Sequence, residues 1–327
     1  MKYFMHVGVM LIAWMLGSAQ VAQAQNPVAT WPSNPVRILI GYPPGSGQDF
    51  TARLVAERLR AKTGQPFVVE HRPGASGHIA TEFVYKAAPD GHTLLVAPPA
   101  FATTPFMFSS IPFDPEAMMP VTIMATQYSV LLVNSERLPA VRTLQELIAH
   151  AKANPGKLNY GSSGNGGSQH LAIEMLRMRA GNLQMTHVPY KGVAVMTGLV
   201  GGEVDLTVFT LATAMPHIRS GKIRALAVGS ERRDPLLPDV PTLAESFPGM
   251  TSATWFAVLA PPRTPPELVA KINAECVEAL RDPEAVKRLA DITVHVVANS
   301  PAEAAAFLAE ERKRWGEVIR AARIRAG

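Results

Sequence analysis

Two glycine-rich segments of the chain combine residue types that can bind an anion through the backbone. The first glycine-rich segment, Tyr42 to Asp49, is YPPGSGQD, and the second, Tyr160 to Ser168, is YGSSGNGGS. Each follows a short apolar run and precedes an amphipathic helical pattern. A helix leaves its first N–H groups unpaired and is partly positive at that end, and glycines let an anion approach closely. The sequence therefore predicts two halves that close on one small anion.

Alternating strand and helix patterns must position these segments. In the first part of the chain, apolar runs predict strands at 36–40, 67–70 and 93–97, separated by helices at about 49–61 and 78–88. Strands that alternate with helices of this length indicate right-handed crossovers and a parallel sheet.

A second α/β block follows an unusually long extended run at 121–133. Its predicted helices lie at about 143–153, 169–180, 193–200 and 212–220, and its strands at about 158–160, 185–188, 204–209 and 223–229. Another extended run, 253–260, leads to three helices at about 265–280, 283–290 and 301–322.

This order favours one domain interrupted by another. We expect an α/β protein with a discontinuous lobe formed by 25–126 and 251–327, and a second lobe formed by 127–250. The two extended runs would cross between the lobes as a hinge. A hinged binding protein, with its ligand between the lobes, has this organisation.

The first residues have the pattern of a cleaved export signal. Lys2 precedes an apolar stretch over 4–16, and Ala22-Gln23-Ala24 is an A-x-A cleavage pattern. The apolar stretch is shorter than the roughly 20 residues that span a bilayer, which argues against the alternative of an uncleaved anchor. We expect 1–24 to be a signal peptide removed after Ala24, and the mature protein to be periplasmic.

Charge and cysteine content narrow the function further. The formal charge is +5, and its Lys and Arg residues are scattered beside acidic residues. This distribution predicts solvated helix faces and no nucleic-acid partner. The single cysteine, Cys276, lies in a helical pattern and is expected to be a packing residue. His71 and His78 have no metal-ligand spacing, so we expect no metal and no cofactor.

Six spaced motifs resemble one family of receptors. In order they are PPGSGQD at 43–49, EHRPGASG at 70–77, APDGHTLL at 88–95, NYGSSGNG at 159–166, HVPYKG at 187–192 and LPDVPT at 237–242. They resemble the Bug receptors, the extracytoplasmic solute-binding components of tripartite tricarboxylate transporters, from about residue 31 to 322. The resemblance implies a two-lobed periplasmic binding protein fold of type II that binds a carboxylated metabolite. It also implies delivery to a permease of one small and one large integral membrane subunit, and we expect the receptor to be a monomer.

The resemblance also implies a set of ligand-binding residues. In the first segment Tyr42 would form a wall, and the backbone of Gly45, Ser46 and Gly47 would donate to the ligand, part of the contact passing through ordered waters. Asp49 would either cap the helix or order the ligand side of the loop. The full expected set is Tyr42, Gly45, Ser46, Gly47, Gln48, Asp49, Ala100, Thr103, Ser162, Gly164, Gly166, Gly167, Ser168 and Thr210. Lys191 is expected to be a solvated loop residue.

Several positions depart from the family pattern. Ser46 replaces a usual glycine, Gln48 a usual threonine or serine, and Gly167 a usual threonine. Thr210 stands where an aspartate is common, which removes a potential partner for a ligand hydroxyl or amine. The segment 98–105 is bulkier and stiffer than the usual small-residue loop. These departures leave the identity of the carboxylate open.

Two enzyme classes and a sensing role are the alternatives. Gly45-x-Gly47 and Glu70 resemble part of a dinucleotide-binding pattern, but Phe50 occupies the place of its third glycine. A serine hydrolase requires G-x-S-x-G, and the nearest sequence, 166–170, ends in His170. We therefore expect no enzymatic activity. A receptor of the same fold could instead present its ligand to a sensor kinase or scavenge without a permease, and the sequence leaves those roles open.

Overall fold

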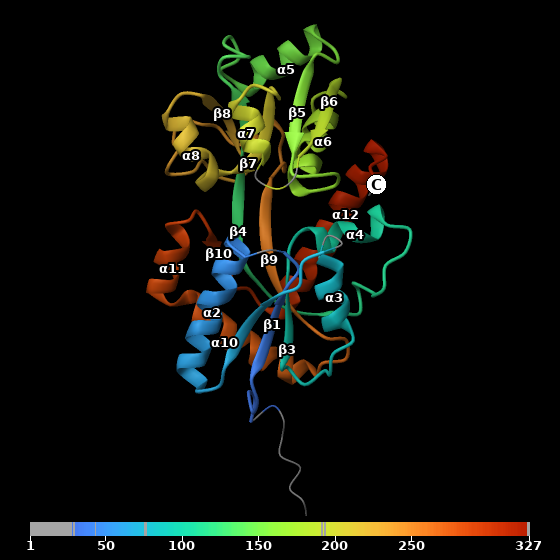
Figure 1. Ribbon diagram of the computed structural model, residues 1–327, viewed down its shortest axis with the longest axis vertical. Helices are drawn as coiled ribbons and strands as arrows, with labels where there is room; N and C mark the ends of the chain where they lie inside the picture. Colours follow the sequence, from blue (N-terminus) through green and yellow to red (C-terminus); the bar gives the residue numbers. More distant parts are fainter. Residues whose placement is uncertain are drawn as a thin grey trace, which may run out of the picture.

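The computed structural model describes residues 28, 30–42, 44–74, 77–190, 192 and 194–325, and Figure 1 shows them as two lobes joined by two long strands. The predicted signal peptide and its cleavage site lie outside the described residues. Among the helices in the described ranges, none has both the length and the apolar character needed to cross a membrane.

The first lobe begins with the predicted alternation of strands and helices. Its elements are β1 (Val36–Ile40), α2 (Gly47–Thr63), β2 (Phe67–His71), α3 (His78–Tyr85), β3 (Thr93–Ala97) and α4 (Ala100–Met107). β1 pairs in parallel with both β2 and β3, which gives the order β2-β1-β3. α4 was not predicted, because Pro98, Pro99 and Pro105 suggested a stiff loop. Two of these prolines precede the helix, where a missing N–H costs no helical hydrogen bond.

The long extended run of the sequence is a single strand that belongs to both lobes. This strand is β4 (Met119–Asn134). Its first part, to Tyr128, pairs antiparallel with β9 (Ala253–Ala260), which in turn pairs antiparallel with β3. From Ser129 onward it pairs antiparallel with β7 (Leu206–Thr210) and β8 (Ile223–Val228). In Figure 1, β4 and β9 run side by side between the lobes.

The second lobe repeats the strand order of the first. Its other elements are α5 (Leu144–Ala153), β5 (Leu158–Ser162), α6 (Ser168–Arg179), β6 (Met185–Pro189), α7 (Ala194–Val200), α8 (Leu211–Arg219) and α9 (Leu243–Ser246). β5 pairs in parallel with β6 and β7, so the order β6-β5-β7 matches β2-β1-β3.

The chain ends in helices that cover the first lobe and reach the second. They are α10 (Pro266–Arg281), α11 (Pro283–Ala290) and α12 (Pro301–Ala322), with the short strand β10 (His295–Val296) between the last two. α12 begins at a capping box in which Ser300 and Glu303 bond each other's backbone N–H. Its Leu308 packs into the core of the first lobe, whereas Trp315 and Ile319 pack into the core of the second. Figure 1 shows α12 extending along the side of both lobes.

The first sheet is buried on both faces, as alternate residues of β9 show. Phe256 and Val258 belong to the core that also contains residues of α2 and α10, while Trp255 and Leu259 belong to the core on the opposite face. Burying side chains of this size contributes about 1.5–3 kcal/mol each. Because both faces are covered, the edges and the strand ends are left to form a site.

The pairing directions make the strand ends of the two sheets face each other. β3 is antiparallel to β9 and β9 to β4, so β1, β2 and β3 run with β4 toward the second sheet. β7 is antiparallel to β4 and parallel to β5, so β5, β6 and β7 run back toward the first sheet. Both groups of carboxyl ends therefore point to the place where β4 changes sheet, at Tyr128 and Ser129. The crevice outside the carboxyl ends of parallel strands is where ligands bind in open α/β sheets.

Candidate functional site

Helix N-termini converge where the strand ends meet. α2, α3 and α4 follow the parallel strands of the first lobe, and α6, α7 and α8 follow those of the second. The start of α2 lies next to the point where β4 passes from one sheet to the other, because a β-carbon on Gly47 would lie 2.9 Å from Oε1 of Gln127 in β4. The site predicted from the two glycine-rich segments is thus framed by helix starts from both lobes.

Four of these inward-facing helix starts differ chemically from most of the other helix starts, and α2 is the exception, with Ser46 as its cap and Asp49 in its first turn. Within the described residues, α3, α4, α6 and α8 begin without a capping side chain and without an acidic residue in the first turn. By contrast, α5, α9, α11 and α12 each have a capping side chain and a glutamate in the first turn. Each uncapped start carries about half a unit of positive charge. Four of them around one location create a positive potential with little contribution from basic side chains.

The first glycine-rich segment is held together by its own acidic residue. Ser46 caps α2 by accepting from the Asp49 N–H at 3.2 Å, and the Asp49 carboxylate accepts from the Gly45 N–H at 3.0 Å. Arg53 and His71 also contact that carboxylate, at 2.8 and 2.9 Å. The N-cap of α2 is thus Ser46 and not Asp49, which holds the loop through the Gly45 N–H instead. A role of Asp49 toward a ligand stays a prediction. The Gly45 N–H, expected to bind the ligand, already has an acceptor in the loop.

Two other predicted residues connect the first glycine-rich segment to the ends of neighbouring strands. Gln48 is buried, and its Nε2 donates to the carbonyl oxygen of Val96 at the end of β3, at 2.6 Å. The carbonyl oxygen of Tyr42 lies 2.8 Å from Nδ1 of His71, and burial raises the pKa of the Tyr42 hydroxyl. Both residues fix the loop to the ends of β1, β2 and β3.

The second glycine-rich segment is tied to two histidines that the sequence analysis did not assign to the site. Oγ of Ser162 lies 2.7 Å from Nε2 of His187 and accepts from the Gly164 N–H at 3.1 Å. The Gly166 N–H donates to Nδ1 of His170 at 3.0 Å. Gly167 is the N-cap of α6 and Ser168 is its first residue, so these two are placed at the uncapped helix start. The contact of Ser162 with His187 joins neighbouring strands, so no local pattern reveals it, whereas Gly166 and His170 are only four residues apart.

The glycines at 47 and 166 serve packing as well as backbone access. A β-carbon on Gly47 would also approach Val294 and Phe256, at 3.3 and 3.4 Å, so its missing side chain lets α2 lie close to β9 and the segment before β10. A β-carbon on Gly166 would lie 2.0 Å from Cε of Met107, at the end of α4. Met107 therefore touches the second glycine-rich segment from the first lobe.

The remaining predicted residues lie at two other helix starts. Ala100 begins α4, and its carbonyl oxygen accepts from the Thr103 hydroxyl at 3.2 Å and from the Thr104 hydroxyl at 2.7 Å. Thr210 is the N-cap of α8, and its hydroxyl lies 3.2 Å from that of Thr213. Lys191 lies outside the described residues.

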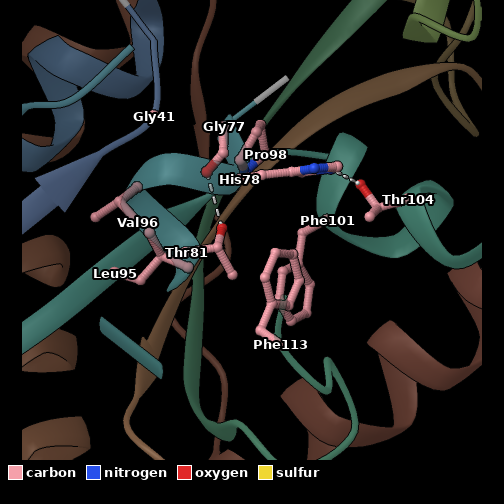
Figure 2. A pocket seen from close by; sticks show the side chains of 10 residues that line it. All are labelled: Gly41, Gly77, His78, Thr81, Leu95, Val96, Pro98, Phe101, Thr104 and Phe113. Carbon is pink, nitrogen blue, oxygen red and sulfur yellow. Dashed lines mark hydrogen bonds between the residues drawn. The ribbon is translucent and has the colours of Figure 1, made fainter. Parts of the chain in front are cut away.

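A small cavity lies beneath the first lobe's strand ends, and Figure 2 shows it lined by His78, Pro98, Phe101 and Phe113 among others. Its volume of about 10 Å³ is the space of one water molecule. Nε2 of the buried His78 lies 2.9 Å from Oγ1 of Thr104, which joins the start of α3 to α4. Burial lowers the pKa of His78, so its imidazole is neutral at pH 7. In the sequence, His78 is recognisable only as a histidine without metal-ligand spacing, so this contact was not predicted.

No group of His, Cys, Asp and Glu in the described part of the chain is arranged to hold a metal ion. Cys276 is buried in α10, and burial raises the pKa of its thiol to about 12. The thiol is therefore protonated at neutral pH and suited to packing.

The buried histidines predict a loss of stability in acid. Burial, reinforced by the neighbouring His187 and Arg177, lowers the pKa of His170 to about 3. The unfolded chain binds that proton near pH 6.5, so stability present above this pH is lost as pH falls toward 3. Between pH 7 and 5, His170 alone accounts for a loss of at most about 2 kcal/mol. Urea unfolding at both pH values should show a smaller loss in His170→Asn than in the wild type; equal losses would contradict the assignment.

Comparisons with known proteins agree in pointing to one family. The family model for the "Tripartite tricarboxylate transporter family receptor" matches residues 51–324. The chain is similar to protein BugT of Bordetella pertussis, with 35% identity over 298 residues that cover 89% of this chain and 90% of that protein.

Two solved structures have the same fold. An R. palustris protein solved with adipate has a TM-score of 0.78 and 34% identity, over 90% of this chain and 99% of its own. MatC from Rhodopseudomonas palustris, solved with bound malate, has a TM-score of 0.73 and 30% identity, over 88% of this chain and 100% of its own.

Proposed function

The chain belongs to the tripartite tricarboxylate transporter receptor family, and from that membership we propose that it captures a small carboxylated metabolite between its lobes. It is a substrate-binding receptor and not an enzyme, with the two-lobed periplasmic binding protein fold of type II. β4 and β9 are the two strands that cross between the lobes. We propose further that it delivers its ligand to a permease formed by a small and a large integral membrane subunit.

One observation carries the proposal: the inward-facing starts of α3, α4, α6 and α8 have neither capping side chains nor first-turn acids, whereas the outer helices α5, α9, α11 and α12 have both. Among the inward-facing starts, α2 is the exception, with Ser46 as its cap and Asp49 in its first turn. At α4 the N–H groups of Phe101 and Ala102 already bond to the carbonyl oxygens of Pro98 and Pro99, so the starts of α3, α6 and α8 are the better sources of N–H donors for a ligand between the lobes. Hydrogen bonds to a charged acceptor contribute about 1.5–3 kcal/mol each. The carboxylates named with two relatives, adipate and malate, have the chemistry that such donors would recognise.

In this proposal, the ligand-facing groups are the helix-start amides of the two glycine-rich segments, with Ala100, Thr103 and Thr210 at the neighbouring helix starts. The amides of Gly45, Gly164 and Gly166 have acceptors within the protein. They therefore shape the segments, and the N–H groups of Gly47 and Ser168, at the first positions of α2 and α6, are the better candidate donors.

We propose that 25–126 and 251–327 close against 127–250, with α12 as a third connection because its two ends pack in different cores. Closure would bring the strand ends together around the ligand. Small-angle scattering should show compaction on addition of a saturating ligand.

The proposal is tested by a ligand screen. Thermal-shift measurements of the mature protein against mono-, di- and tricarboxylates, amino acids and aromatic acids should yield a carboxylate that stabilises it. The expected gain is about 2.7 kcal/mol at a hundredfold excess over Kd. Calorimetry then gives the affinity. Stabilisation by neutral or cationic compounds alone would reject carboxylate binding.

We also propose that the protein is exported to the periplasm and cleaved after Ala24. Mass spectrometry of the exported protein should give an N-terminus at Gln25. A mass that includes 1–24 would contradict cleavage.

A further inference from the structure

Two imidazole rings are stacked directly behind the second glycine-rich segment. The rings of His170, in α6, and His187, in β6, have centroids 3.8 Å apart and planes 13° apart. The ring of Tyr160 contacts both, with its centroid 4.9 Å from that of His187 and 6.0 Å from that of His170. His170 is 7% exposed, so this stack is part of the interior of the second lobe.

The hydrogen bond from the Gly166 N–H fixes the protonation of His170. Because an N–H donates to Nδ1 at 3.0 Å, Nδ1 carries no proton, and in the neutral ring the proton lies on Nε2. That atom faces Oε1 of Glu174 at 4.0 Å. Protonation of Nδ1 would place two N–H groups against each other and release Gly166.

His187 holds the other end of the segment. Its Nε2 contacts the Ser162 hydroxyl at 2.7 Å, and the same oxygen accepts from the Gly164 N–H at 3.1 Å. The two histidines together therefore fix the loop at Ser162, Gly164 and Gly166.

Burial keeps the histidine pair uncharged at neutral pH. Tyr160, Glu174 and Arg177 are the ionisable neighbours, and Glu174 accepts from the hydroxyl of Tyr160 and from Arg177. Burial lowers the pKa of both histidines, and Arg177 acts in the same direction. Glu174, which would favour a charged imidazole, is itself paired with Arg177.

We propose that His170 and His187 are positioning residues that lock the second glycine-rich segment in the shape presenting the start of α6 to the ligand. The consequence for affinity rests on the proposed carboxylate-binding function; the locking of the loop does not. A neutral pair suits this role, because it accepts from the backbone without adding charge to the site.

The first test needs no ligand. In ¹⁵N-correlated NMR of the protein at pH 6 to 8, Nδ1 of His170 should show the shift of an unprotonated, hydrogen-bonded nitrogen and should not titrate. The Gly166 N–H should exchange with solvent at least tenfold faster in His170→Leu than in the wild type. His170→Asn, whose Oδ1 can replace Nδ1 as acceptor, should retain most of the protection. Equal exchange in His170→Leu and the wild type, or a protonated Nδ1, would overturn the proposal.

The second test measures binding, with adipate and malate as probes. Affinity should fall at least tenfold in His170→Leu and stay within about threefold of wild type in His170→Asn. His187→Phe keeps an aromatic ring for stacking but removes the contact to Ser162, and should also lose affinity. Normal binding by both His170→Leu and His187→Phe would reject the positioning role. If neither probe binds the wild type, the proposed function loses support for these ligands, while the exchange measurement still decides whether His170 locks the loop.

Discussion

Gly167→Asp is expected to leave the protein at least as stable as the wild type and to lower its affinity for a carboxylate about a hundredfold. Gly167 is the N-cap of α6, with φ −65° and ψ 163°, a conformation that aspartate adopts readily. A β-carbon there would meet its nearest neighbour, the Gly164 carbonyl oxygen, at an ordinary 3.4 Å. The new carboxylate would cap the helix and stabilise it by about 0.5–1 kcal/mol.

The same carboxylate should exclude the ligand. It would use the N–H groups of the helix start and repel a ligand carboxylate about 6 Å away by roughly 3 kcal/mol at an effective dielectric constant of about 20. Calorimetry gives the affinity and thermal unfolding gives the stability. A mutation that merely damages the fold would lower both the affinity and the stability. A lower affinity together with an unchanged or higher stability therefore identifies the start of α6 as part of the anion site.

Two control variants separate the effect of the added charge from the effect of helix capping and from the effect of its position in the protein. Gly167→Asn caps the helix without a charge and should lose less affinity than Gly167→Asp. Thr143→Asp adds a carboxylate at the start of α5, which already has a capping box and is not among the inward-facing helices. It should bind normally. Wild-type affinity in Gly167→Asp would exclude the start of α6 from the site.

The elements that local sequence encodes were predictable. The apolar run at 121–133 indicated a long strand, and the structure has β4 there with nearly the same bounds. The glycine-rich segments were recognisable as loops that precede helices, because glycine content and the start of an amphipathic pattern are local signals. The alternation of strands and helices predicted the parallel pairing of β1 with β2 and β3, and of β5 with β6 and β7, for the same reason. The antiparallel pairing of β4 with β7, β8 and β9 was not predicted, so the sheets are mixed.

Contacts between distant segments were not predictable. His170 and His187 are separated by a helix and a strand start, and their stacking exists only after β5 and β6 pair. The prolines around α4 gave a loop-like sequence, so the helix that brings Met107 to the second lobe was missed. The two ends of α12 pack in different cores. The helical spacing of its apolar residues does not show which core each of them joins.

The backbone at Gly166 combines two constraints that differ in their origin. Its φ of +68° is in the left-handed region, which costs an alanine about 1–2 kcal/mol. Its missing side chain leaves room for Met107, whose Cε would lie 2.0 Å from an added β-carbon. Overpacking of this kind costs about 1–3 kcal/mol. The cost of overpacking depends on Met107, whereas the cost of the left-handed backbone does not.

We therefore expect Gly166→Ala to lower the free energy of unfolding by about 2–5 kcal/mol, and Met107→Ala to recover part of that loss in the double variant. Met107→Ala alone should cost about 2–5 kcal/mol, because Met107 is buried in the second lobe's core. Urea unfolding of the wild type, both single variants and the double variant gives the coupling energy. A favourable coupling above about 1 kcal/mol would establish that α4 supports the second glycine-rich segment directly. Additive losses would contradict that contact and leave the left-handed backbone as the sole reason for a glycine at 166.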